Sequence, residues 1–316
     1  MRILEDKHVD FLGRRKLGFM ISGVALIVAL VALIYPGLEA GIDFKGGTEF
    51  VVETDTPVPP GTALQALDAA LATGTEVKEY GEATSLLIRT TAGTDPGQDL
   101  NIDALQTRVT DAIASAAPGS NPTVQRVDAV GPRFADDLQR GALFAVFGSL
   151  FVILLYIFVR FDWRYALGAV LCLAHDVIIV LGIFALFHVL TPVTMQLNQS
   201  LIAALLTIVG YSINDTVVVY DRIREYANLF KTEAFESVAN KAINSTLSRT
   251  ILTSGTTLIS VTILLIFGGE VLRGFALALL IGIAVGTYSS IFVASPLVVF
   301  FRERYAPARR VVSARV

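Results

Sequence analysis

Asn214 and Asp215 lie side by side inside an apolar run that begins near Leu197 and is long enough to cross a bilayer. An ionised carboxylate near the middle of a membrane helix costs about 2.5–3.5 kcal/mol on insertion scales, so it normally has a partner, a water-filled path or a function. Asp221 marks the water boundary further along, which puts Asp215 about 9 Å inside the membrane. An acid close enough to the headgroups to be harmless is the alternative. The depth favours a functional pair that takes part in a proton relay.

Three further side chains that can carry charge are candidates for this relay. His175 and Asp176 lie in the third apolar run of the chain, residues 165–190. They are about 16 Å along it, near the bilayer midplane. If the fifth helix begins near Asn244, Arg249 is about 8 Å deep, level with Asp215. An arginine there stays charged and favours an ionised Asp215, whereas burial favours the neutral acid, so a proton can come and go with a small rearrangement. His175 and Asp176 are candidates for the next step of the relay.

Two other stripes in the spans consist of small or hydroxyl residues. In the fifth run, hydroxyls share a face with Arg249, and hydrogen bonding to the helix backbone or a lining for water are both open explanations. In the sixth run, Gly282 and Gly286 continue a stripe of small residues spaced four apart, which predicts close helix packing.

The composition is that of a multi-span membrane protein. The chain has 316 residues, of which 53% are hydrophobic and 17% charged, and its mean hydropathy of +0.63 is too high for an ordinary soluble domain. A single cysteine excludes an intramolecular disulfide, and the histidines show no zinc-type spacing. We therefore predict no metal and no cofactor.

Nucleotide binding is also excluded by the motifs. The glycine-rich segment at residues 41–48 lacks the Gly-Lys-Ser/Thr of a phosphate-binding loop, and we expect no helix to begin there. Its glycines instead predict a tight turn into a strand. Because the chain carries no site for ATP, an ion gradient is the remaining energy source, and an intramembrane acid can respond to one.

Six apolar runs predict six transmembrane helices. They are residues 17–35, 141–159, 165–190, 197–220, 250–268 and 274–301. Arginine and lysine are concentrated in the amino-terminal segment, the second and fourth connections and the carboxy-terminal tail, whereas the short loops on the other side carry only Arg273. The positive-inside rule therefore predicts that both termini are cytoplasmic.

The segment between the first two spans has the composition of a soluble domain. Its periodicity predicts strands at 49–55, 76–81, 85–91 and 123–129 and helices at 60–72 and 99–117. The order β-α-β-β-α-β is the ferredoxin-like arrangement of two helices on an antiparallel sheet. The predicted fold class is thus a multi-pass α-helical membrane protein with a ferredoxin-like α+β extracytoplasmic domain between helices 1 and 2.

These assignments divide the chain into five segments. They are a cytoplasmic amino-terminal segment at 1–16, transmembrane helix 1 at 17–35, the extracytoplasmic domain at 36–139, the bundle of transmembrane helices 2–6 at 140–301, and a basic cytoplasmic tail at 302–316.

Several motifs, taken together, resemble the SecF family of bacterial protein-export membrane proteins. The shorter ones are Gly41-Ile-Asp-Phe-Lys-Gly-Gly-Thr48, Val130-Gly-Pro132 and His175-Asp176. The longer ones are Gly210-Tyr-Ser-Ile-Asn-Asp-Thr-Val-Val-Val-Tyr-Asp-Arg-Ile-Arg-Glu225 and Asn244-Ser-Thr-Leu-Ser-Arg-Thr-Ile-Leu-Thr-Ser-Gly-Thr-Thr257. The resemblance runs from the first helix through Arg304.

The resemblance implies a half-unit of the resistance-nodulation-division architecture, in the bacterial inner membrane, whose other six spans come from SecD. It further implies proton-driven assistance to the late translocation of a polypeptide, beside the SecYEG channel and the SecA motor, with YajC as a companion. It assigns proton coupling to Asp215 and Arg249 and implies a transport subunit rather than an enzyme.

Two other functions remain open from the residues alone. A proton-coupled small-molecule efflux half-unit shares the layout and the buried acid, although its outer domain is usually much larger. The other is a non-transporting assembly factor, in which Asp215 has a structural role.

Overall fold

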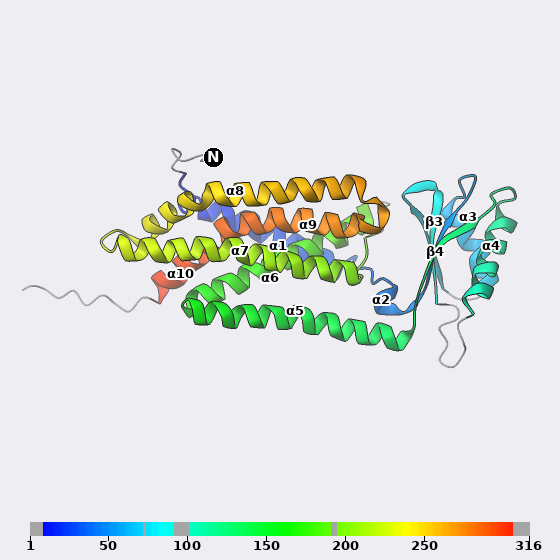
Figure 1. Ribbon diagram of the computed structural model, residues 1–316, viewed down its shortest axis with the longest axis horizontal. Coiled ribbons are helices and arrows are strands. Elements are labelled where there is room, and N and C mark those ends of the chain that lie inside the picture. Colours follow the sequence, from blue (N-terminus) through cyan, green and yellow to red (C-terminus); the bar gives the residue numbers. More distant parts are fainter. Residues whose placement is uncertain (1–8, 72–73, 92–100, 191–194, 306–316) are drawn as a thin grey trace, which may run out of the picture.

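The structure is a computed structural model that describes residues 9–71, 74–91, 101–190 and 195–305. A small α+β domain lies at one end of a long helical bundle (Figure 1). The elements of the domain, in chain order, are α2 (Ile42–Lys45), β1 (Gly47–Glu53), α3 (Pro60–Leu71), β2 (Thr75–Tyr80), β3 (Glu82–Thr90), α4 (Ile102–Ala116) and β4 (Thr123–Val130). The elements of the bundle are α1 (Arg15–Ile34), α5 (Pro132–Arg160), α6 (Trp163–Leu190), α7 (Gln199–Leu229), α8 (Phe235–Phe267), α9 (Gly269–Ser289), the π-helix η1 (Ser290–Ala294) and α10 (Ser295–Arg304).

Six helical segments of the described residues are long and apolar enough to cross a membrane, as predicted. The last span is made of α9, η1 and α10 together, so a π-helical turn interrupts what the sequence predicts as one continuous helix. The predicted connection before the fourth span lies partly outside the described residues. The same holds for residues 306–316 of the predicted tail and residues 1–8 of the predicted amino-terminal segment.

The domain has the predicted ferredoxin-like fold. Its four strands form one sheet in the order β2-β3-β1-β4, and every pair is antiparallel. Alternate residues of the central strands, such as Phe50 and Ile88, point toward α3 and α4 and are fully buried there. The period-two pattern of the strands therefore determines which face of the sheet forms the core. Asp99 and Leu100, the expected start of the second helix, lie outside the described residues.

The opposite face of the sheet carries a network of charged side chains. Arg89 bonds Glu49 (Nε to Oε2, 2.7 Å) and Glu39 (Nη1 to Oε1, 3.3 Å), and Lys78 bonds Glu39 (Nζ to Oε2, 2.6 Å). Burial opposes ionisation of Glu39, but hydrogen bonds and the charges of Lys78 and Arg89 outweigh it and hold the pKa below its usual 4.5. The network ties the segment after α1 to the sheet.

One expectation about the glycine-rich segment is wrong, because the short helix α2 forms at Ile42–Lys45. Gly46 and Gly47 follow it with φ of 73° and 132°. These angles are open to glycine and costly for other residues, and Gly46 also lies against Pro132 at the start of α5. The paired glycines therefore reverse the chain from α2 into β1 beside the second membrane helix.

The domain is joined directly to the fourth span. The carboxylate of Asp43 accepts a hydrogen bond from the backbone N–H of Gln199 at 2.8 Å, at the first turn of α7. The backbones of residues 39–41 and Leu197 also exchange hydrogen bonds as an isolated parallel bridge. An acceptor at the first turn satisfies a free N–H of the helix and complements its dipole. The end of α7 is thus held by the glycine-rich segment.

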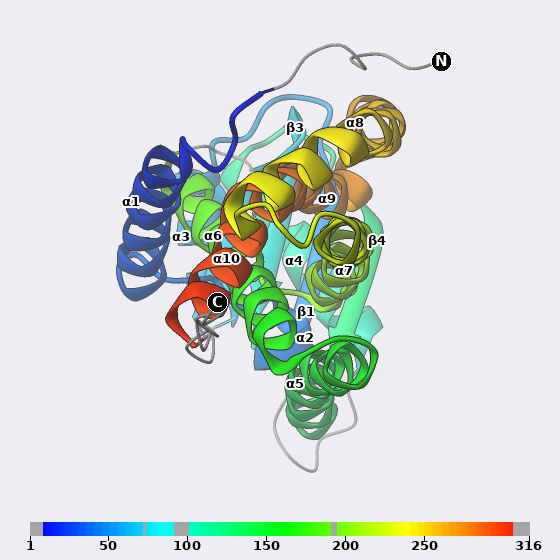
Figure 2. The ribbon, with the colours of Figure 1, turned by 90° about the vertical axis from the view of Figure 1, so that its left-hand side faces the viewer.

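Within the bundle, the helices differ in how much they bury. In the most apolar stretch of α5, 6% of the residues are buried, compared with 56% in the last span. Viewed along the bundle, α1 and α5 lie at its periphery (Figure 2). Outward side chains of α5 such as Phe144 and Val159 are 80% and 83% exposed, as expected for a surface that contacts lipid.

The domain should fold without the bundle, because it has its own core between the sheet and two helices. We expect a fragment of residues 36–131 to unfold cooperatively and to show mixed helix and sheet by circular dichroism. Ionised Glu39 stabilises the fold above pH 4.5, and this contribution is lost as pH falls through its lower folded pKa. The fragment should therefore lose stability in acid, and Glu39→Gln should reduce that loss. A disordered spectrum at neutral pH would refute this prediction.

Candidate functional site

One face of α7 carries the buried polar residues of the fourth span. Ser212, Asp215 and Thr216 follow the helical spacing i, i+3 and i+4, and each is at most 4% exposed. Asn214 lies on another face and is exposed, without a hydrogen bond among the described residues. The structure therefore separates the two adjacent residues that the sequence groups together.

Asp176 is the centre of a first buried cluster, formed by α6, α7 and α9. Its Oδ2 accepts hydrogen bonds from the Ser212 hydroxyl at 2.7 Å and the Ser289 hydroxyl at 2.9 Å. Its Oδ1 lies 2.9 Å from Nδ1 of His175, while the buried Nε2 of His175 has no partner among the described residues. Asp176 is 1% exposed. Its carboxyl group is thus held by three side chains and kept away from the surface of the bundle.

Asp215 belongs to a second cluster, formed by α7, α8 and α9. Its Oδ2 accepts a hydrogen bond from the Ser254 hydroxyl at 3.3 Å, and Ser254 in turn accepts one from Thr287 at 2.7 Å. The Thr287 hydroxyl also lies 2.7 Å from the backbone carbonyl of Ile283, so its one proton is shared between the two acceptors. Among the described residues Asp215 therefore has fewer and longer hydrogen bonds than Asp176, and a neutral hydroxyl provides its bond.

Further hydroxyls on α7 connect these clusters to the π-helical turn η1. Thr216 and Ser290 lie 3.1 Å apart, and Ser290 itself donates to the carbonyl of Gly286 at 2.8 Å. The hydroxyl of Tyr220 donates to the carbonyl of Ala294 at 3.2 Å. Across the turn, the hydroxyl of Ser295 donates to the carbonyl of Ser290 at 2.8 Å. Side-chain hydroxyls thus add hydrogen bonds to the backbone around the π-helical turn.

Gly282 and Gly286 lie where α9 crosses α7. A Cβ at Gly282 would lie 2.3 Å from Ile208, and one at Gly286 would lie 3.0 Å from Ser212. The absence of side chains lets the two helices approach closely. This approach brings Ser289 of α9 within reach of Asp176 and Thr287 within reach of Ser254.

Arg249 is exposed on α8 and makes no hydrogen bond or ion pair with Asp215 among the described residues, although it is close enough to act on that carboxylate through space. The assumption that its helix begins near Asn244 is wrong, because α8 begins at Phe235. The hydroxyls around Arg249 mostly donate to carbonyls of their own helix, as Thr253 does to Arg249 at 3.0 Å and Thr256 to Leu252 at 2.9 Å. Backbone bonding, one of the two explanations for this stripe, is therefore observed.

The sequence does not single out Ser212, Ser254, Thr287 and Ser289 as partners of the acids. Ser212 could have been found from its spacing, three residues before Asp215 on the same helix face. The others lie on neighbouring helices, so their contacts depend on packing. Asn244, part of a family motif, has a different role, since its amide accepts from the N–H of Val9 at 2.8 Å and holds the segment before α1.

The arrangement allows proton exchange within the bundle. A carboxyl group enclosed by hydroxyls can be held as an acid or as an anion, because a hydroxyl both donates and accepts hydrogen bonds. Two such carboxyl groups, Asp176 and Asp215, lie in neighbouring clusters. Among the described residues no group of three or more metal-binding side chains comes together.

Two family models match the chain. One, described as the C-terminal part of the protein export membrane protein SecD/SecF, matches residues 109–304, and the other, the SecD/SecF GG motif, matches residues 36–58. The protein translocase subunit SecF of Rhodothermus marinus is 53% identical over 316 residues, covering 100% of both chains. SecF of Escherichia coli O157:H7 is 37% identical over 293 residues, covering 92% of this chain and 87% of that protein.

Solved structures agree with the sequence relatives. The crystal structure of SecDF, a translocon-associated membrane protein from Thermus, superposes with a TM-score of 0.83 at 35% identity. The match covers 96% of this chain and 40% of the SecDF chain. A super-membrane-facing form of SecDF superposes with a TM-score of 0.68 at 36% identity. With its sequence relatives, its six membrane helices and its ferredoxin-like domain in agreement, the chain belongs to the SecF family of protein translocase subunits.

Proposed function

We propose that this translocase subunit uses the proton-motive force to assist late steps of polypeptide translocation through SecYEG. The observation that supports this most directly is the pair of buried carboxylates, Asp176 and Asp215, held by hydroxyls inside the membrane bundle. One elementary charge crossing 100 mV releases about 2.3 kcal/mol, enough to bias a two-state movement. The work is that of a transport subunit, without a catalytic site.

Asp215 is the residue that takes up and releases the proton in this mechanism. Within the described part of the chain it has a single hydrogen bond, from Ser254 at 3.3 Å, so a small displacement of α8 changes its surroundings. Arg249 is not bonded to it here and, if brought nearer, would stabilise the anion. Asp176 and His175 form the next station, and Asn214 contributes from the exposed side of α7.

The complex that performs this work includes a second six-span half, SecD, as in the solved SecDF chain, with SecA and YajC as further partners. Polar side chains on the outside of the bundle support such a half. Asn214 and Arg249 are exposed on α7 and α8 at membrane depth, where contact with lipid is unfavourable. A partner that covers this face would also enclose the relay.

The subunit crosses the bacterial inner membrane with both termini in the cytoplasm and the ferredoxin-like domain outside. The distribution of arginine and lysine supports this orientation. Asp43 then links the outer domain to α7, so that a movement at Asp215 can reach the domain along one helix.

Asp215→Asn should remove gradient-dependent translocation, because the amide keeps the shape of the carboxylate and does not titrate. Arg249→Met should have the same effect. The measurement is polypeptide export in inverted vesicles with and without an imposed proton gradient. Early, ATP-driven translocation and assembly of the complex should remain at wild-type level.

Asp221→Asn is the matched control for these variants, since Asp221 is exposed on the same helix, where it pairs with Arg160 at 3.2 Å. It should respond to the gradient as the wild type does. A full response of Asp215→Asn vesicles would rule out Asp215 as the coupling residue.

Asn214→Leu should weaken co-purification with the partner half, because an interhelical polar contact contributes about 0.6 kcal/mol in a membrane. The readout is the fraction of partner retained as detergent concentration is raised. Gln139→Leu, a loss of an exposed amide on α5, should leave retention unchanged. If Asn214 faces lipid instead, leucine should stabilise the chain, and undiminished retention would contradict the proposed interface.

A reporter active only outside the cytoplasm should be active when inserted at Gly119, and inactive when fused after the last residue. Gly119 lies in an open turn between α4 and β4 with no atom within 4 Å of an added Cβ, so the domain should tolerate the insertion. The reverse pattern of activity would overturn the orientation.

A further inference from the structure

A cavity of about 310 Å³ lies at the end of the bundle away from the outer domain. It is formed by the connection between α5 and α6, the last turns of α7, and α10. The charged side chains that line it are Arg164, Arg224, Arg302 and Asp162, and its neutral lining includes Tyr165 and Asn228. Nothing in the relay described above involves this cavity.

The charges around the cavity are unbalanced. Three guanidinium groups face it from three different elements, and one carboxylate, Asp162, bonds Arg164 at 3.3 Å. Nearby charged groups do not correct the excess, since Arg160 pairs with Asp221 and Arg222 with Glu225 outside the cavity. Three like charges brought together repel one another unless an anion joins them.

The arginines are fixed by contacts that leave donors free. Arg164 donates through Nη2 to the Tyr305 carbonyl at 2.8 Å, while its buried Nε has no partner among the described residues. Arg224 donates to the Arg160 carbonyl at 3.1 Å, and Arg302 lies 3.9 Å above the ring of Phe235. A guanidinium held in this way keeps several N–H groups for a phosphate.

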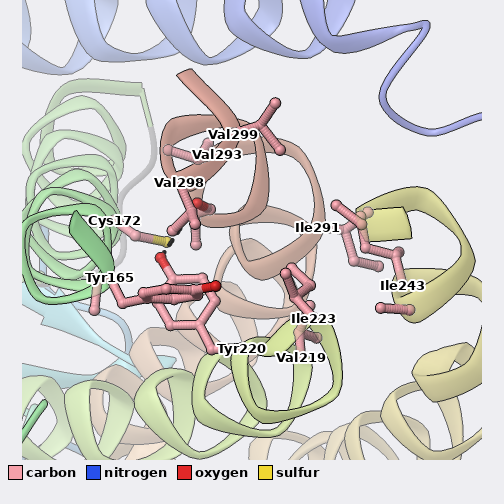
Figure 3. Close-up of a cluster of buried hydrophobic side chains, with 14 of the residues drawn as sticks. Tyr165, Cys172, Val219, Tyr220, Ile223, Ile243, Ile291, Val293, Val298 and Val299 are labelled. Atoms are coloured by element: carbon pink, nitrogen blue, oxygen red, sulfur yellow. Dashed lines mark hydrogen bonds between the residues drawn. The ribbon is translucent and has the colours of Figure 1, made fainter. Parts of the chain in front are cut away.

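Tyr165 gives the cavity a rigid floor. Its ring packs edge-on against Tyr220 with centroids 5.1 Å apart, and the two lie together in the buried cluster beside α10 (Figure 3). Its hydroxyl interacts with Arg302. The floor therefore offers a hydroxyl donor next to the arginines.

The cavity lies where the chain leaves the membrane. The second span ends at Arg160 and the third begins at Trp163, and aromatic side chains gather there as they do at headgroup level. The helices that form the cavity carry exposed apolar side chains near it in sequence: Phe158 and Val159 on α5 and Phe300 on α10 are 56%, 83% and 56% exposed. These helices thus offer a polar site for a headgroup and an apolar surface for acyl chains.

We propose that this cavity binds the phosphate of an anionic phospholipid headgroup. The convergent arginines recognise the phosphate, and Tyr165 and Asn228 donate hydrogen bonds to the remaining oxygens. The apolar surface distinguishes a lipid from free phosphate, because only a lipid gains from contact with Phe158 and Val159. Basic pockets between membrane helices are known to select anionic lipids on these grounds. The bound lipid joins the ends of α6, α7 and α10.

The single tryptophan of the chain, Trp163, provides a direct test, since it lies beside Arg164 with 5.4 Å between guanidinium and ring. The full chain is reconstituted in vesicles that contain brominated phosphatidylglycerol or brominated phosphatidylcholine, which quench tryptophan fluorescence on contact. Phosphatidylglycerol should quench at a lower mole fraction. The double variant Arg224→Gln/Arg302→Gln should reduce this preference about tenfold or more, as expected when hydrogen bonds to a charged group are lost.

Three comparisons decide the result. Arg222→Gln removes a charge from the same helix outside the cavity and should keep the wild-type preference; an equal loss there would show diffuse surface charge and overturn the proposal. Ala227→Phe fills the cavity without removing charge, so it should also abolish the preference, even if the arginine variants do not fold. Equal quenching of the wild type by the two lipids, or full competition by inorganic phosphate, would equally overturn the lipid site.

Discussion

A carboxylate inside a membrane bundle is costly unless other groups stabilise it, so it depends on hydrogen bonds from the protein around it. Asp176 meets this requirement with the hydroxyls of Ser212 and Ser289 and the ring of His175. The rest of the bundle follows from it. Ser289 can reach Asp176 only because α9 lies against α7 at Gly282 and Gly286, and the same close approach brings Thr287 to Ser254 and so to Asp215.

The helix that carries Asp215 also connects the two parts of the molecule. At its first turn α7 is capped by Asp43 from the glycine-rich segment, and at its far end it lines a cavity with Arg224 and Asn228. Its middle holds Ser212, Asp215 and Thr216. One continuous helix of 31 residues therefore connects the glycine-rich segment, the buried acid and the far end of the bundle.

The local pattern of the sequence was sufficient to predict the six spans and the ferredoxin-like domain, because the spans appear as long apolar runs and the domain as periods of two and 3.6 residues. It also placed Asp215 and Asp176 inside the membrane. The contacts of these acids could not be predicted, since Ser254 and Ser289 are far from them in sequence and meet them only through packing. The helix α2 and the early start of α8 were missed because short or polar helices have weak periodic signals. The predicted depth of Arg249, level with Asp215, assumed that its helix begins near Asn244, whereas α8 begins at Phe235.

The π-helical turn at Ser290–Ala294 changes the direction in which the side chains after it point, relative to those of α9. A wide turn accommodates one more residue than an α-helical turn, and one residue corresponds to about 100° of rotation. All that follows is therefore turned out of phase with α9. With the extra residue, Val298 faces the buried core and Arg302 the cavity; a regular helix of the same sequence would point both elsewhere. Deletion of one residue in this turn would restore a regular helix. It would rotate α10 about its axis, so that a different side of α10 would face the neighbouring helices.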